Sequence, residues 1–245
     1  MGKKFKQLIR LNSDDLILYF SVVGGVFLLI HLITACVLFF GDVGSSPMVS
    51  GVVLPIVAGF MAVIATISHV GVAFTDALRF GQTRKTALAL TLGLSAFETI
   101  SMAVLSLLLT ILERCFAPRL WAALTGARGY VMESPVPVPE GSTAVETGLL
   151  YVEDVSLDWW WALLIPLGCL LLGLIIGAFL QRFGGKAGWI LWGVWMVVCF
   201  GPQLLPWDRL PSLPLFPVLY VLAPLVALAL LIWSLWSLLH AVVKA

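Results

Sequence analysis

Long apolar runs, separated by short polar segments, dominate the pattern along this chain. The run over residues 16–40 contains no charged residue, and the later runs contain almost none. A helix needs about 20 apolar residues to cross the hydrocarbon of a bilayer, and these runs are too continuous for the alternating strands of a membrane β-barrel. The pattern predicts an all-α, polytopic membrane protein whose six spans lie at about residues 16–40, 50–75, 87–112, 159–181, 187–205 and 215–240.

Three segments beside the spans complete this single transmembrane domain, residues 1–245. Residues 1–13 alternate basic and apolar side chains at helical spacing, which predicts an interfacial amphipathic helix; a disordered basic tail is the alternative. Residues 113–158 are predicted to form a long extracytoplasmic loop with an extended, proline-rich centre and a short interfacial helix before it. Prolines in residues 203–217 predict a broken or re-entrant element there.

Composition agrees with a membrane protein, since 61% of the residues are hydrophobic and only 11% are charged. These values argue against a disordered chain, a basic nucleic-acid-binding domain and an ordinary cytosolic enzyme. The four cysteines lie far apart, and three of them fall inside apolar runs. Their spacing therefore predicts neither a disulfide framework nor a zinc site.

The distribution of lysine and arginine predicts the orientation. An even number of spans places both termini on one side, together with the segments at residues 76–85 and 182–186. Most of the 14 basic residues lie in these segments: Lys3, Lys4, Lys6, Arg10, Arg79, Arg84, Lys85, Arg182, Lys186 and Lys244. Because basic residues are retained on the cytoplasmic side, we expect both termini in the cytoplasm and the chain to cross the cell membrane several times.

Motifs for catalysis are missing from the sequence. Lys186 follows two glycines but precedes Ala187, so the phosphate-binding loop of nucleotide-hydrolysing proteins is absent. The chain also lacks the His-Glu-x-x-His and Gly-x-Ser-x-Gly patterns. His31 and His69 fall inside spans, where neutral histidines bonded to a neighbouring helix are favoured over a metal site. We therefore expect no catalytic residue, metal or cofactor in this chain.

Glu98 is the one charged residue deep within a predicted span. An ionised side chain at that depth costs roughly 3 kcal/mol, so Glu98 must face other helices or a water-filled cavity. Thr91 and Ser95 precede it at helical spacing and share its face. Two interpretations stay open: the three residues line a pathway for a transported molecule or proton, or Glu98 is protonated and hydrogen-bonded at a helix interface.

Two short stretches carry a resemblance to a known family. Phe80-Gly81-Gln82-Thr83-Arg84-Lys85 resembles the Gly-x-Ser/Thr-Arg-Lys/Arg segment in membrane permease subunits of bacterial ATP-binding cassette transporters of the exporter-like type-2 class. The glycine-rich fourth span, with the turn Arg182-Phe183-Gly184, is similar to the corresponding span of many such permeases. The predicted six spans with both termini inside match the same class.

The resemblance implies a translocation subunit coupled to a separate ATPase subunit, which binds ATP and Mg²⁺. The loop after the second span would dock into a cleft of that ATPase, through Ala77, Leu78, Arg79, Phe80, Gly81, Thr83, Arg84 and Lys85. A second permease copy or a sister permease would complete the complex, surrounded by the lipid of the bacterial cytoplasmic membrane. Two alternatives stay open: a non-transporting sensor or scaffold, for example in resistance to peptide antibiotics, and a membrane-embedded enzyme.

Overall fold

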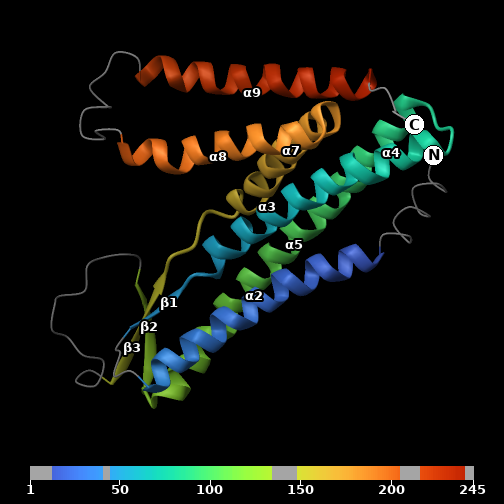
Figure 1. Ribbon diagram of the computed structural model, residues 1–245. Helices are drawn as coiled ribbons and strands as arrows, with labels where there is room; N and C mark the ends of the chain where they lie inside the picture. Colours follow the sequence, from blue (N-terminus) through green and yellow to red (C-terminus); the bar gives the residue numbers. More distant parts are fainter. Residues whose placement is uncertain (1–12, 41–44, 134–147, 205–215, 241–245) are drawn as a thin grey trace. The chain divides into compact units, whose positions relative to one another are not determined.

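The computed structural model describes residues 13–40, 45–133, 148–204 and 216–240 (Figure 1). The expected interfacial helix at residues 1–13 and the expected re-entrant element at 203–217 lie almost entirely outside these residues. The described chain is mainly helical, as the apolar runs predict. Its long helices are α2 (Ser13–Phe40), α3 (Ser50–Ser68), α5 (Arg84–Thr125), α7 (Trp161–Phe183), α8 (Gly185–Leu204) and α9 (Phe216–Leu239).

Within the described residues, four helical stretches are long and apolar enough to cross a membrane: Ser13–Phe40, Ser50–Arg79, Arg84–Thr125 and Trp161–Phe183. The second consists of α3, the π-helical turn η1 (His69–Ala73) and the short helix α4 (Phe74–Arg79). These helices support the prediction that the chain is embedded in a membrane. The count of six spans and their orientation stay predictions.

The chain folds as two compact units. The first, here called the sheet unit, comprises Met1–Ala62 and Ala96–Cys169. The second, the α9 unit, comprises Val63–Ser95 and Leu170–Ala245.

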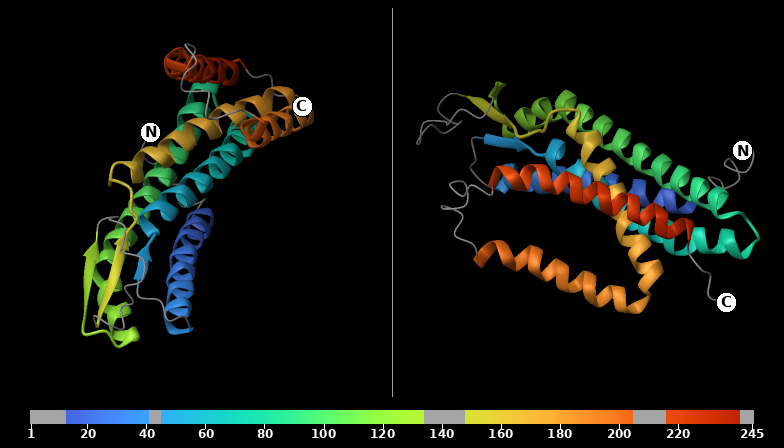
Figure 2. Two further views of the ribbon diagram at one scale, coloured as in Figure 1. Left: turned by 90° about the vertical axis from the view of Figure 1, so that its left-hand side faces the viewer. Right: turned by 90° about the horizontal axis from the view of Figure 1, so that it is seen from above.

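The sheet unit contains a small parallel sheet that the all-α prediction missed. Strands β1 (Ser45–Met48), β2 (Gly129–Glu133) and β3 (Leu149–Asp154) are arranged in the order β1-β3-β2, and both pairings are parallel. Leu150 and Val152 of β3 are buried against Met48 and Trp121. All views in Figures 1 and 2 show β2 and β3 beside the C-terminal end of α5.

Helix α5 also differs from the prediction, because it continues to Thr125 instead of ending near residue 112. Its 42 residues would span about 63 Å at the rise of an α-helix. The sequence suggested only a short interfacial helix here. This extension of α5 has one buried face, because Ala117, Trp121 and Ala122 pack into the same hydrophobic core as the sheet residues.

In the α9 unit, α7 approaches the helical stretch of α3 and η1 closely. A Cβ added to Gly173 would lie 2.9 Å from both the Cβ of Thr66 and the carbonyl oxygen of Val63. A Cβ added to Gly177 would lie 2.9 Å from the Cβ of Val70. The Gly-x-x-x-Gly pattern in the fourth predicted span therefore serves close helix packing, as in many membrane proteins.

Candidate functional site

The predicted ATPase-coupling segment forms a compact turn between α4 and α5. The amide of Gln82 donates to the carbonyl of Ala77 at 3.0 Å, and the amide of Gly81 donates to the carbonyl of Leu78 at 3.0 Å. This pair of bonds is a Schellman motif, which ends a helix with one left-handed residue. Gly81 takes that conformation with φ +77°. The glycine of the motif is therefore required by the turn itself.

Thr83 has an equally local role at the start of α5. Its Oγ1 accepts a hydrogen bond from the amide of Thr86 at 3.3 Å and lies 2.8 Å from the hydroxyl of Thr86. A threonine that accepts from the third amide of a helix is a typical N-cap. Gly81 and Thr83 together fix the geometry of the turn, and this explains why both residues stand where they do.

The other residues of the predicted coupling segment divide into an inward and an outward group. Ala77 and Leu78 pack against the hydrophobic core of the α9 unit. Phe80 is 85% exposed, and Arg84 and Lys85 are exposed as well. Arg79 forms an exposed ion pair with Asp76 at 3.7 Å. A partner that touches this turn would meet Phe80, Arg84 and Lys85.

The second predicted turn has a similar construction. Gly184, with φ +61°, follows the last residue of α7, and its amide donates to the carbonyl of Leu180 at 2.8 Å. The guanidinium of Arg182 lies over aromatic rings, with its Cζ 5.4 Å from the ring centre of Trp233 and 5.9 Å from that of Phe183. These distances are within the range of cation–π attraction.

The C-terminal end of α9 brings the two turns together. Arg84 Nη1 donates to the carbonyl oxygen of Leu239 at 3.4 Å, and Arg182 Nη1 donates to Ser237 Oγ at 3.4 Å. The Nε2 of Gln181 donates to Thr75 Oγ1 at 3.4 Å, which joins the end of α7 to α4. Figures 1 and 2 show the end of α9 beside the turn after α4. We call this set the α9-end cluster: Arg84, Arg182, Phe183, Trp233, Trp236, Ser237 and Leu239.

The side chains of the predicted pathway residues are all buried. Thr91 and Ser95 are 3% and 1% exposed in the α9 unit, and Glu98 is 0% exposed in the sheet unit. Ser95 Oγ lies 3.0 Å from Nδ1 of His69, which stands at the start of the π-helical turn η1. Histidine bonded to a neighbouring helix is the interpretation that the sequence favoured for His69.

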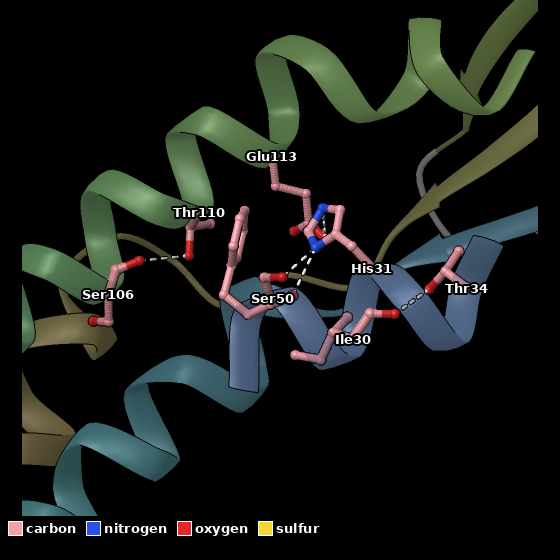
Figure 3. Close-up of polar contacts among 8 residues, drawn as sticks. Ile30, His31, Thr34, Ser50, Ser106, Thr110 and Glu113 are labelled. Carbon is pink, nitrogen blue, oxygen red and sulfur yellow. Dashed lines mark hydrogen bonds and ion pairs between the residues drawn. The ribbon is translucent and has the colours of Figure 1, made fainter. Parts of the chain in front are cut away.

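A buried polar cluster in the sheet unit was missed by the sequence analysis (Figure 3). Glu113 of α5 accepts a hydrogen bond on Oε1 from Ser50 Oγ at 2.9 Å, and His31 Nε2 lies 3.7 Å from the same oxygen. The other imidazole nitrogen of His31 donates to the carbonyl of Phe27 at 2.9 Å. We call His31, Ser50 and Glu113 the Glu113 cluster. It joins α2, the start of α3 and α5.

The surroundings of this cluster are aromatic and apolar. The imidazole of His31 stacks on Phe116 and Trp121, with ring centres 5.2 and 5.7 Å apart. Glu113 is 4% exposed and Ser50 is 0% exposed. The sequence placed Glu113 in a loop, and for His31 it favoured a neutral histidine bonded to a neighbouring helix over a metal site with His69. It offered no signal for this cluster, because the three residues come from different helices.

The Glu113 cluster has the residue types of a catalytic triad but not the connections. A triad requires the serine hydroxyl to donate to the imidazole. Here the hydroxyl of Ser50 donates to the carboxylate, and Nδ1 of His31 is occupied by a backbone carbonyl. The arrangement therefore lacks the serine–histidine hydrogen bond of a triad and instead links α2, α3 and α5.

Arg114, the next residue on α5, contacts the sheet. Its Nη2 lies 2.9 Å from Asp154 Oδ2 at the end of β3 and also donates to the hydroxyl of Ser156. Neighbouring residues of one helix point to different sides. Glu113 thus contacts α2 and α3, while Arg114 contacts the chain that leaves the sheet.

Across the described residues, no group of three or more His, Cys, Asp or Glu side chains could hold a metal ion. Comparisons with protein-family models, with curated proteins and with solved structures find no match for this chain.

Proposed function

We propose that this chain is the transmembrane subunit of an ATP-driven transporter of the ATP-binding cassette type, with six spans and both termini in the cytoplasm of a bacterial cell. It forms the translocation pathway together with a second permease chain. A separate ATPase subunit binds and hydrolyses ATP and contacts the cytoplasmic end of the α9 unit.

One observation carries this proposal. The two stretches that resemble the family, Phe80–Lys85 and Arg182–Gly184, are 97 positions apart between Lys85 and Arg182, yet both contact the last turn of α9. If both stretches contact one partner, they must lie on the same surface of the chain. The shared surface displays exposed Phe80, Arg84 and Lys85.

The mechanism follows from the rigidity of this region. ATP-driven closure of two ATPase domains moves whole helices when a docked element transmits the motion. The turn at residues 80–83 is fixed at both ends by helix caps, and α4 is packed into the core through Ala77 and Leu78. Force applied to Phe80 would therefore act on α4 and α5 together.

Helix α5 is much longer than a membrane span. Only about 20 residues of a helix fit within the hydrocarbon, whereas α5 has 42. The part of α5 beyond the predicted span belongs to the segment predicted to be extracytoplasmic, and it packs against the small sheet.

The test of the ATPase contact reverses charge on the exposed turn. Arg84→Glu with Lys85→Glu should reduce recovery of the ATPase with the tagged permease about tenfold or more, because buried or close like charges at an interface cost several kcal/mol. The measurement is affinity purification from membranes, with the ATPase identified by mass spectrometry through its phosphate-binding loop.

Arg119→Glu with Arg128→Glu is the matched control. Both arginines are exposed and lie in the predicted extracytoplasmic segment. Replacing both with glutamate changes the net charge by the same amount as the double substitution at Arg84 and Lys85. Equal loss of the ATPase from both double variants would contradict the proposed contact. An ATPase that is recovered but whose hydrolysis no transported compound stimulates would instead favour the sensor or scaffold.

A further inference from the structure

The last turns of α9 are packed tightly against the coupling region. Leu238 is 1% exposed and lies in the same core cluster as Phe74 of α4 and Ala87 of α5. Leu235 and Leu239 pack on this cluster from the same helix. Apolar contacts of this kind hold the C-terminal end of α9 next to the turn that carries Phe80.

Arg84 makes a polar contact that links the two helix ends. A cation in the first turn of a helix is unfavourable because the N-terminus carries partial positive charge, and α5 has no acid in its first turn to offset Arg84. The carbonyl oxygen of Leu239, to which Arg84 donates, is one of the last carbonyls of α9 that have no donor within their own helix. The negative end of α9 thus accommodates a cation at the positive end of α5.

Arg182 holds the same end of α9 from the other side. Its guanidinium lies over the rings of Trp233 and Trp236, which are three residues apart on one helix face, and Nη1 donates to Ser237. Phe179 adds a ring contact to Trp233 at 6.2 Å between centres. These contacts attach α9 to the end of α7. They are contacts between the two helices and not within either one.

The surface around this end is strongly basic. Asp76 is the sole acidic residue in the described part of the α9 unit, and it is paired with Arg79. Besides Arg79, the exposed basic side chains are Arg84, Lys85, Arg182 and Lys186, and the exposed His240 follows the last residue of α9. Such a surface complements an acidic patch on a protein partner.

We infer that the C-terminal end of α9, residues 233–240, is a third part of the surface that contacts the ATPase, and that Arg182 is the residue that positions it. The inference rests on the proposed function and extends it: neither family-like stretch includes α9. The partner surface would be acidic and would touch Phe80, Arg84 and His240 together.

The experiment places single cysteines at this surface. In a variant whose four native cysteines are replaced by serine, Phe80→Cys and His240→Cys carry a benzophenone maleimide, and membranes are irradiated. Both positions should cross-link to a protein that mass spectrometry identifies by a phosphate-binding loop. Arg128→Cys, in the predicted extracytoplasmic segment, is the control and should give no such product.

Arg182→Ala tests the positioning role in the same assay. It should lower the cross-link from position 240 about fivefold, since the cation–π and hydrogen-bond contacts are lost, and leave the cross-link from position 80 unchanged. Arg182→Lys keeps the charge but not the planar group, so it should restore part of the yield. A variant that merely misfolds would lose both cross-links.

The outcomes separate the two proposals. A cross-link from position 80 without one from position 240 would overturn the role of α9 and leave the ATPase contact intact. An unchanged yield at position 240 in Arg182→Ala would refute the role of Arg182. Failure of both positions to capture a phosphate-loop protein would remove the proposed function and this inference with it.

Discussion

The α9-end cluster and the Glu113 cluster are both polar sites in an apolar chain, but they differ in exposure. Ser50 donates to Glu113, His31 lies 3.7 Å from the same carboxylate oxygen, and Ser50 and Glu113 are almost fully buried. In the α9-end cluster, Arg84 and Arg182 are exposed even though each contacts α9.

This difference separates a structural role from a binding role. A buried polar group must find its partners within the protein, and its bonds then stabilise the fold. An exposed cation that also contacts a neighbouring helix still has donors to offer. We therefore assign the Glu113 cluster to stability and propose recognition for the α9-end cluster. The predictions below compare losses of stability with losses of ATPase recovery.

The largest expected effect is on the Glu113 cluster. Glu113→Ala should lower the free energy of unfolding by about 3 kcal/mol, because it leaves buried Ser50 and His31 without their shared partner. Thermal unfolding of the purified protein in detergent measures this loss. Asp158→Ala, at an exposed carboxylate, should change stability by no more than about 0.5 kcal/mol.

If Glu113→Ala were as stable as the parent protein, the cluster would not be the structural element that its burial indicates. The division into two roles would fail in another way if this variant remained folded but lost the ATPase as completely as the charge reversal at Arg84 and Lys85.

A substitution in the closely packed part of α7 is expected to have an intermediate effect on stability. Gly173→Ala should destabilise the protein by about 2 kcal/mol, since overpacking a tight contact forces backbone shifts. Gly193→Ala, whose added Cβ would meet nothing within 4 Å, should be neutral or stabilising because alanine favours the helix. The two unfolding midpoints, measured side by side, should therefore move in opposite directions or differ clearly; equal midpoints would refute the close approach.

The smallest effect on stability is expected at the coupling turn. Gly81→Ala should cost about 1 kcal/mol, because a left-handed backbone is strained for alanine. The turn is the proposed docking element, so recovery of the ATPase should fall further than this small loss of stability explains. Gly24→Ala, which has open space around it and no positive φ, is the control. Full recovery of the ATPase with Gly81→Ala would show that the geometry of this turn is unimportant for docking.

Much of the helical framework was predictable from the apolar runs. The apolar runs predicted helices close to α2, α3, α7, α8 and α9, since each run is long and free of charge. The extension of α5 to Thr125 was not predictable, because Glu113, Arg114 and Arg119 interrupt the apolar pattern there. Glu113 contacts α2 and α3, and Arg114 contacts the end of β3. These contacts offset part of the cost, and they depend on elements far along the chain.

The parallel sheet escaped prediction for a similar reason. Its strands are short, and β1 and β3 are separated by more than 90 residues. Pairing of strands in parallel depends on which segments the rest of the fold brings together. The segment at residues 76–85 was identified from its residues as a polar connection between two spans, whereas the contact of Arg84 with Leu239 was not predicted, because the two residues are 155 positions apart.

By itself, the sequence determined the helices and the two turns, because apolar runs, the glycines at positions 81 and 184 and the cap at Thr83 act through neighbouring residues. Only the tertiary structure decided which polar groups meet. Ser50 reaches Glu113 across 63 positions and Arg84 reaches Leu239 across 155. A hydrogen bond over such a separation requires both helices to be in place first, and their packing depends on the whole fold.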